Sequence, residues 1–373
     1  MKFSAAVNVT QLDQFDELID VRSPSEFALD HIPGAINLPV LYDDERVRVG
    51  TQYKQESSFA AKKTGAALIA RNIANHIENE LSNCAKHWRP LVYCWRGGNR
   101  SASLAHVLRQ IGWQSQTLDG GYKAYRRHIV SELQQLPESL NFRIVCGPTG
   151  SGKSRVLQHL ALLGGQVLDL EELAAHRGSV LGNIPDCTQP TQKFFESSIW
   201  QLLRGFRADR PVYVEAESKK IGNLRVPETL IARMWTSPSL RIEIPLSARV
   251  DFLLCDYAHF LQNFEDLKAK LSCLNSLHGT NKIEEWLKLA AASQWPMLVE
   301  QLLVEHYDPA YQRSTLSHYP NLAESPLFGA ERIDETSLEC LAKTILREIP
   351  ATAPTESLVA ERDAIRRPAI PPS

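Results

Sequence analysis

A short segment around Cys94 combines the residue types that make a reactive thiol. The apolar run 90–94 predicts a buried strand that ends at Cys94, and a helix is predicted to begin near Ser101. Between them lie two glycines and the arginines Arg96 and Arg100. Loop N–H groups, the N-terminus of the helix and the guanidinium charges all favour thiolate over thiol. We therefore predict that Cys94 is a nucleophile, with Arg96 and Arg100 stabilising it and orienting an anionic substrate.

A second segment has the pattern of a phosphate-binding loop. Residues 147–154, GPTGSGKS, match G-x-x-x-x-G-K-S, follow the predicted strand 142–146 and precede a predicted helix. In this setting backbone N–H groups surround a diphosphate, Lys153 neutralises its terminal oxygens and Ser154 is placed to bind Mg²⁺. The predicted phosphate ligands are Gly147, Gly150, Ser151, Gly152, Lys153 and Ser154.

Residues elsewhere supply candidates for the metal and for a further anion. Glu215 and Glu217 alternate along the predicted strand 211–218, so both side chains should lie on one face and bind Mg²⁺ directly or through water. His176 and Arg177 lie in a loop that follows an acidic segment. They are candidate anion ligands, and an ordinary solvated loop is the alternative.

Basic side chains outside the two loops form two local groups. Lys123, Arg126 and Arg127 lie in the first half of the chain, and Lys219 and Lys220 in the second. Because the formal net charge is −2, a nucleic-acid partner requires positive charge that is gathered locally. We predict that the two groups contact a nucleic-acid backbone, although solvated surface charge explains any one of them alone.

The composition excludes several classes of protein. The 373 residues are 43% hydrophobic and 23% charged, as in globular proteins with two or three domains. Seven cysteines are scattered without a CxxC pair, which argues against a disulfide framework or a zinc site. No apolar run is long enough to span a membrane, and the N-terminal residues lack the apolar core of a signal peptide. We therefore expect a cytoplasmic protein with no membrane partner.

The elements that position these residues alternate along the chain as in α/β folds. Predicted parallel strands lie at 18–22, 35–40, 90–94, 116–120, 142–146, 166–170, 211–218 and 239–246. The predicted organisation is an α/β domain at 1–135, a P-loop domain at 136–246, a helical extension at 247–349 and a flexible tail at 350–373. Residues 283–307 predict one long helical region with a kink at Pro296.

The first domain resembles the rhodanese-like domains. Residues 20–39, DVRSPSEFALDHIPGAINLP, are similar to the first rhodanese signature, and residues 118–127, LDGGYKAYRR, to its closing segment. The resemblance implies that Asp20 and Arg22 lie at the end of a central strand near the active loop. They are expected there either as an internal ion pair or as catalytic residues.

The length of the cysteine loop departs from most rhodaneses. Five residues separate Cys94 from Arg100, whereas rhodanese loops that carry a persulfide resemble Cys, four residues, Arg. The longer loop is similar to that of the related cell-cycle phosphatases, where it surrounds a phosphate. This similarity suggests a tetrahedral, phosphate-bearing ligand.

The order of the two loops, CWRGGNR before GPTGSGKS, resembles the tRNA 2-selenouridine synthases. Similar segments lie at 45–55, 120–126, 168–182, 214–222 and 307–311, so the resemblance covers about residues 16–315. It implies action on 2-thiouridine at the wobble position of the tRNAs for Lys, Glu and Gln. The sulfur is first alkylated with geranyl diphosphate, and selenium from selenophosphate then replaces the geranylthio group.

Within this resemblance the two loops divide the chemistry. Cys94 is expected to carry selenium as a Cys–Se species, and residues 147–154 to hold geranyl diphosphate with Mg²⁺, although the same loop fits ATP or GTP. Two other functions stay open. One is a sulfurtransferase or persulfide carrier regulated by a fused nucleotide-binding domain, and the other is a phosphatase that uses the Cys–five–Arg loop.

Overall fold

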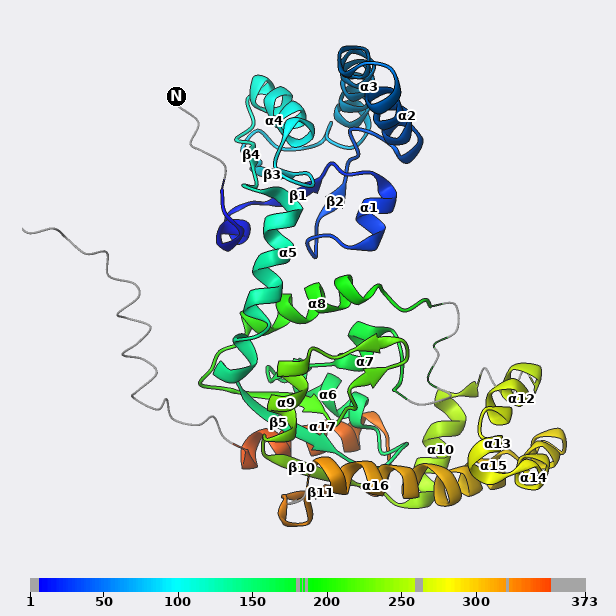
Figure 1. The fold of residues 1–373 in the computed structure, drawn as a ribbon. Coiled ribbons are helices and arrows are strands. Elements are labelled where there is room, and N and C mark those ends of the chain that lie inside the picture. Colours follow the sequence, from blue (N-terminus) through cyan, green and yellow to red (C-terminus); the bar gives the residue numbers. More distant parts are fainter. Residues whose placement is uncertain are drawn as a thin grey trace, which may run out of the picture. The chain divides into compact units, whose positions relative to one another are not determined.

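The computed structural model describes residues 7–178, 182, 184, 187–258, 264–319 and 322–349. The chain forms two compact units (Figure 1). The first contains the residues up to Gln134 together with Thr191–Gln201, and the second contains Gln135–Pro190 and the residues from Leu202 onward. The domain predicted at 136–246 included 191–201, whereas this segment packs with the first unit. The predicted tail 350–373 lies outside the described residues.

A four-stranded parallel sheet organises the first unit. Its strand order is β2-β1-β3-β4, and its strands are β1 Glu17–Asp20, β2 Ile36–Asn37, β3 Pro90–Tyr93 and β4 Gln116–Thr117. The helices are η1 Val9–Gln14, α1 Pro24–Leu29, α2 Asp43–Gln55, α3 Ser58–Asn79, α4 Asn99–Ile111 and α5 Gly121–Glu132. In α3, the buried residues Ala61, Gly65, Leu68 and Asn72 follow one another at steps of three or four residues, which places them on one face of a helix.

A five-stranded parallel sheet organises the second unit, in the order β11-β10-β5-β7-β6. Its strands are β5 Asn141–Cys146, β6 Gln166–Leu168, β7 Pro211–Glu215, β10 Ser239–Glu243 and β11 Leu327–Gly329. The surrounding elements are η2 Leu136–Ser139, α6 Lys153–Leu162, α7 Leu170–Ala174, α9 Glu228–Trp235, η4 Leu322–Glu324 and α17 Glu335–Glu348. Helix α8, Gln192–Gly205, begins in the first unit and ends in the second.

The strands that carry the two loops lie inside their sheets. β3 has β1 and β4 as neighbours, and β5 has β10 and β7. Their residues Val92, Ile144 and Val145 are fully buried. Such continuous apolar runs are typical of parallel strands that are covered on both faces. Both loops therefore start from the rigid interior of a sheet.

The chain after β10 is mainly helical. Its elements are α10 Leu246–Asp256, α12 Phe264–Ser272, α13 Asn275–His278, α14 Thr280–Ala291, α15 Trp295–Leu302, the π-helical turn Leu303–Tyr307 and α16 Asp308–His318. The predicted helical region over 283–307 is helical, but it is interrupted before Trp295 and is not kinked at Pro296. α14 ends at Ala291, Ser293 has a φ of +55°, and Pro296 lies in the first turn of α15. Proline fits a first turn because it lacks only an N–H that would have no helical partner.

Two small elements were not predicted. β8 Lys220–Ile221 and β9 Leu224–Arg225 form an antiparallel hairpin, and β11 adds a strand to the edge of the larger sheet. Strands this short carry too few residues for a recognisable pattern. None of the described helices is both long and apolar enough to cross a membrane.

Candidate functional site

The thiol of Cys94 lies where β3 turns toward α4. The backbone N–H of Gly98 donates to Sγ at 3.2 Å, and the hydroxyl of Ser101 donates at 3.3 Å. Burial of the thiol acts against ionisation. The Ser101 hydroxyl and the backbone N–H groups of Ser101, Gly98 and Arg96 outweigh it, so the pKa of Cys94 is lowered. Neutral donors, including a serine that the sequence had not suggested, therefore stabilise the thiolate.

The two arginines predicted to act with Cys94 have different surroundings. Arg100 donates from Nη1 to Oε2 of Glu26 at 3.0 Å, and the same carboxylate pairs with Arg46 at 3.1 Å. Arg96 is exposed, and no carboxylate of the described residues pairs with it. Arg100 is thus held beside the loop, whereas Arg96 can turn toward a ligand. Their catalytic roles stay predictions.

The closing segment 118–127 packs directly against the backbone of the Cys94 loop. The N–H of Tyr122 donates to the carbonyl oxygen of Cys94 at 2.9 Å. A Cβ at Gly121 would lie 2.2 Å from that oxygen, and a Cβ at Gly97 would lie 2.8 Å from a carbonyl oxygen of the closing segment. Both glycines have a positive φ, +57° and +66°. Only glycine fits this backbone-to-backbone contact, which fixes the shape of the loop.

The geometry of Asp20 and Arg22 fits the internal ion pair. Nη2 of Arg22 lies 2.6 Å from Oδ2 of Asp20, and the two side chains are 1% and 0% exposed. Arg22 also donates to the backbone oxygen of Asp30 at 2.6 Å and stacks over the ring of Tyr122 at 4.0 Å. Since Tyr122 binds the backbone of Cys94, the ion pair supports the loop through this ring.

Residues 147–152 form the turn between β5 and α6, and Lys153 and Ser154 begin the helix. Gly150 and Gly152 have φ values of +79° and +71°, which other residues rarely adopt. A Cβ at Gly147 would lie 2.6 Å from the hydroxyl of Ser151. The glycines of the motif thus allow the close turn that a phosphate-binding loop needs.

Two polar side chains of this motif contact groups in or beside the loop. Lys153 donates from Nζ to the carbonyl oxygen of Gly147 at 2.9 Å, so the ammonium folds back over the loop. Ser154 donates to Oε2 of Glu171 at 3.3 Å. The hydroxyl of Ser151 is buried without a hydrogen-bond partner. The predicted phosphate ligands therefore lie together, and their role stays a prediction.

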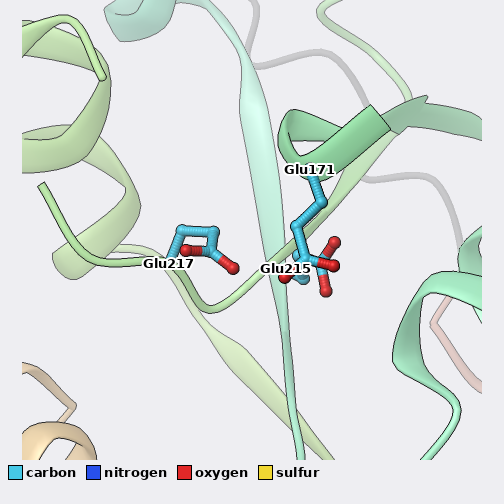
Figure 2. Close-up of side chains that lie close together, drawn as sticks. All are labelled: Glu171, Glu215 and Glu217. Carbon is cyan, nitrogen blue, oxygen red and sulfur yellow. The ribbon is translucent and has the colours of Figure 1, made fainter. Parts of the chain in front are cut away.

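Three carboxylates gather beside the phosphate loop (Figure 2). Oxygens of Glu171, Glu215 and Glu217 lie within 4.8 Å of one another. Glu215 is only 1% exposed, and its Oε1 has no hydrogen-bond partner. Carboxylate oxygens in this arrangement, with the hydroxyl of Ser154 adjoining, are the ligands that hard divalent cations prefer.

Burial is the main cause that raises the pKa of all three carboxyls. It raises the pKa of Glu171 to about 7 and that of Glu217 to about 8, and it holds the pKa of Glu215 well above its usual value. Repulsion among the carboxylates adds to the effect, and Lys153 opposes it. A divalent cation favours the charged forms and removes the repulsion. The residues present therefore fit Mg²⁺.

The prediction for the acidic residues was incomplete. β7 ends at Glu215, so the predicted strand to residue 218 is wrong, and Glu217 joins the cluster from the following loop. The pairing of β7 with β5 stops there because β5 itself ends at Cys146. Glu171, in α7, was missed as a candidate ligand. Its place directly after a strand, in an acidic segment, was the available signal.

The loop with His176 and Arg177 closes over the carboxylates instead of presenting two cations. A Cβ at Gly178 would lie 2.6 Å from Oε1 of Glu171, and Gly178 has a φ of +66°. His176 is buried, and its Nδ1 accepts the N–H of Gly178 at 3.1 Å. Arg177 pairs with Asp256 at 2.8 Å. Their role as anion ligands stays a prediction.

A partly buried ion pair that the sequence did not reveal supports the phosphate loop. Nε of Arg249 donates to the backbone oxygen of Thr149 at 2.9 Å, and Nη2 lies 2.6 Å from Oδ1 of Asp308. The ring of Tyr311 lies 5.9 Å from Nζ of Lys153. The segment 307–311, noted only for its family resemblance, thus reaches the loop through two side chains.

The predicted basic groups are only partly available to a ligand. Arg126 pairs with Glu196, and Lys219 lies over the ring of Trp235 at 5.2 Å. Lys123 and Arg127 are exposed. The two groups lie in different units.

The fold and its two loops define a class: a rhodanese-like unit followed by a P-loop unit with a helical C-terminal region, as the sequence predicted. A family model of the rhodanese-like domain matches residues 5–128, and a model described as the tRNA 2-selenouridine synthase AAA domain matches residues 140–287. A solved rhodanese-related protein from Thermoplasma volcanium is 17% identical over 34% of this chain and 93% of that chain, with a TM-score of 0.22.

Relatives described as tRNA 2-selenouridine synthase extend the match to most of the chain. The protein of Bdellovibrio bacteriovorus is 33% identical over 84% of this chain and 93% of its own length. That of Marinobacter nauticus is 35% identical over 79% and 87%. That of Nitrosomonas europaea is 38% identical, and the match covers 64% of this chain and 63% of that protein. The chain belongs to the tRNA 2-selenouridine synthase family of enzymes.

Proposed function

We propose that the protein converts 2-thiouridine to 2-selenouridine at the wobble position of the tRNAs for Lys, Glu and Gln, by S-geranylation followed by selenation. One observation carries the assignment of steps: the chain holds two loops of opposite chemistry. One presents a thiol of lowered pKa among hydrogen-bond donors, and the other presents a lysine beside three carboxylates. The two loops match the two anionic co-substrates, selenophosphate and geranyl diphosphate.

The phosphate loop is the proposed site of geranyl diphosphate. The loop N–H groups and Lys153 bind the diphosphate, while Glu171, Glu215 and Ser154 hold Mg²⁺, which supplies a Lewis acid for the leaving group when bound. The sulfur of 2-thiouridine attacks C1 of the geranyl chain. The C–O bond breaks with its electron pair going to the diphosphate, and the uridine releases its N3 proton. This alkylation does not require nucleotide hydrolysis.

Electron balance decides between two roles for Cys94. Attack of the thiolate on the selenium of selenophosphate forms an S–Se bond and leaves the P–Se electron pair on phosphorus, so the leaving group is phosphite. Release of phosphate would require a two-electron oxidant, and neither co-substrate provides one. The Cys–Se carrier expected from the sequence therefore does not balance with phosphate as the product.

A phosphoryl role for Cys94 needs no oxidant. The selenium of selenophosphate attacks C2 of S-geranyl-2-thiouridine, the C2–S bond breaks, and geranylthiol leaves after taking a proton. The Cys94 thiolate then attacks phosphorus, and the Se–P electron pair goes to selenium. This gives 2-selenouridine, protonated from solvent at N3, and a cysteine S-phosphate. Water hydrolyses the S–P bond and releases phosphate and the thiolate.

Three features of the Cys94 loop support this role. The donors on Sγ, Gly98 N–H and the Ser101 hydroxyl, favour the thiolate that must attack. Glu26 holds Arg100 beside the loop, where a guanidinium can bind two phosphoryl oxygens. The five-residue spacing between Cys94 and Arg100 leaves room for a phosphate within the loop.

Reconstitution with purified protein tests the proposed function. The reaction contains tRNA with 2-thiouridine, geranyl diphosphate, selenophosphate and Mg²⁺, and no nucleotide. Nucleoside mass spectrometry should show S-geranyl-2-thiouridine first and 2-selenouridine later. Omission of geranyl diphosphate should leave 2-thiouridine unchanged. A strict requirement for ATP or GTP, or 2-selenouridine formed without geranyl diphosphate, would contradict the proposal.

A further inference from the structure

A hollow of 330 Å³ opens beside the Cys94 loop within the first unit. Its lining includes Trp95, Tyr122, Lys123, Arg126, Arg127 and Lys193. The rings of Trp95 and Tyr122 lie 5.2 Å apart at 31° to each other and provide an aromatic wall. We propose that this hollow binds a nucleotide that adjoins the target uridine in single-stranded RNA, with its base stacked on Trp95. The inference rests on the proposed tRNA substrate and adds the place where the RNA strand is held.

The hollow is connected to the thiol through the backbone. Trp95 follows Cys94 directly, and its carbonyl oxygen accepts the N–H of Lys123 at 3.0 Å. The N–H of Tyr122 binds the carbonyl oxygen of Cys94 in the same way, at 2.9 Å. The wall of the hollow and the thiol therefore belong to neighbouring residues of one hydrogen-bonded loop. A base stacked on Trp95 places the next nucleotide of the strand at Cys94.

The cations around the hollow fall into two kinds. Arg126 pairs with Glu196 and donates to the backbone oxygen of Lys193 at 3.2 Å, so it joins α5 to the segment 191–201. Lys123, Arg127 and Lys193 are exposed, and no carboxylate of the described residues pairs with them. Three uncompensated cations around an aromatic wall form the pattern of single-stranded nucleic-acid sites, in which bases stack and phosphates bind lysine and arginine.

The charges favour a nucleotide over the geranyl chain as the occupant. A hydrocarbon that covered the hollow would remove water from nearby ammonium and guanidinium groups without giving them a partner, which is costly. A nucleotide offers a π face to Trp95 and phosphate oxygens to the cations. Of these two occupants, only a phosphodiester strand brings negative charge to the cations around the hollow.

Binding of a tRNA anticodon stem-loop that contains 2-thiouridine tests the proposal. Trp95→Ala should weaken binding on the order of 10- to 100-fold, and Trp95→Phe should retain most of the affinity because the phenyl ring still stacks. Lys193→Ala should reduce the slope of log Kd against log salt by about one unit. Lys62→Ala is the matched control, because Lys62 is exposed on α3 of the same unit and does not line the hollow. It should leave affinity and slope unchanged.

An RNA that lacks the base next to 2-thiouridine makes the test independent of protein folding. Wild-type protein should lose affinity for this abasic RNA by the factor that Trp95→Ala shows with intact RNA. The two changes should not add when combined, since each removes the same stacking contact. Alkylation of Cys94 without RNA should proceed in Lys193→Ala as in wild type, which confirms an intact loop.

The outcomes separate this inference from the proposed function. Wild-type protein that binds the RNA while Trp95→Ala and Lys193→Ala bind equally well overturns the nucleotide site alone, as do additive effects of Trp95→Ala and the abasic RNA. A Trp95→Ala defect confined to S-geranylated RNA assigns the hollow to the hydrocarbon and also overturns it. Wild-type protein that binds no tRNA overturns both proposals.

Discussion

The Cys94 loop and the phosphate loop have the same backbone plan and opposite electrostatics. Each leaves the end of an inner strand of a parallel sheet and leads into a helix, α4 in one case and α6 in the other. Around Cys94 the hydrogen-bond donors prevail, and Glu26 is neutralised by Arg100 and Arg46. Around Lys153 three carboxylates cluster, and one oxygen of Glu215 has no partner.

The charged groups around the two loops differ, and so does what each loop still lacks for its proposed reaction. The donors of the first loop already stabilise a thiolate, so it requires only its anionic substrate. In the second loop burial, and then repulsion between carboxylates, raises the carboxyl pKa values, so we expect that a bound cation is needed to hold these groups charged beside a diphosphate. Under the proposed function, one strand–loop–helix plan thus serves for a nucleophile and for a metal-dependent step.

The largest expected effect is that of Cys94→Ser. Serine lacks the low pKa of the thiol, so formation of 2-selenouridine should fall by at least about 1,000-fold. Geranylation should continue, because the phosphate loop is unchanged. Nucleoside mass spectrometry after incubation with both co-substrates should find 2-selenouridine replaced by its precursors, and a Se-phosphorylated nucleoside among them supports phosphoryl transfer to Cys94. Near-normal 2-selenouridine from this variant would remove Cys94 from the chemistry.

Lys153→Ala should produce the reciprocal defect. Loss of the ammonium removes the main positive charge that neutralises the diphosphate. Geranylation should therefore fall about 100- to 1,000-fold. The variant should still complete selenation when it is given tRNA that already carries the geranyl group. Lys62→Ala changes an exposed lysine of α3 that lies in neither loop and does not line the hollow, so it serves as the control for geranylation. A Lys153→Ala protein that geranylates normally would place the diphosphate elsewhere.

A cation should stabilise the second loop selectively. Saturating Mg²⁺ should raise the melting temperature of the ligand-free protein, on the order of 5 °C or more, because the cation binds only the folded cluster. Glu215→Gln should remove most of this increase, as it replaces a buried oxygen that has no other partner. Cys94→Ser should keep the increase in full. Differential scanning calorimetry with and without Mg²⁺ measures both, and an increase that survives Glu215→Gln would exclude the cluster as the metal site.

The smallest effect concerns the ionisation of the two thiols in the first unit. The lowered pKa of Cys94 means that its thiolate persists to lower pH than that of an ordinary thiol, whereas burial and then the charge of Glu17 raise the pKa of Cys84. Alkylation by iodoacetamide, followed at each residue by peptide mass spectrometry, should reach its midpoint at lower pH for Cys94. Ser101→Ala removes one donor and should move the Cys94 midpoint to higher pH. An unmoved midpoint would show that the loop amides alone stabilise the thiolate.

The sequence predicted the features whose residues are contiguous in the chain, namely the two loops and the strands that precede them. Both loops and their strands were found because the residues that define them are neighbours in the chain, and the apolar runs before Cys94 and Gly147 are buried strands as expected. The predicted strand extended past Glu215, whereas the pairing of β7 with β5 ends at Glu215 opposite Val145, and Glu217 reaches the cluster from the following loop. Register between strands, which sets such ends, depends on pairings that a single segment does not contain.

The supporting residues could not be predicted because they approach the loops from distant parts of the chain. Arg249 and Asp308 meet across 59 positions to hold Thr149. Glu171 joins Glu215 only because β6 and β7 pair side by side. Short polar segments such as these carry no periodic pattern, and tertiary contact alone determines which of many acidic and basic residues line a site.

The strongest test of whether the two loops catalyse separate reactions uses the Cys94→Ser and Lys153→Ala variants one after the other. Thiolated tRNA is incubated with Cys94→Ser, geranyl diphosphate and Mg²⁺, purified, and then incubated with Lys153→Ala and selenophosphate, with nucleoside mass spectrometry after each stage. The two-loop account predicts S-geranyl-2-thiouridine after the first stage and 2-selenouridine after the second, while neither variant alone produces 2-selenouridine from 2-thiouridine. Failure of the second stage with intact geranylated tRNA, or 2-selenouridine from either variant alone, would contradict the account.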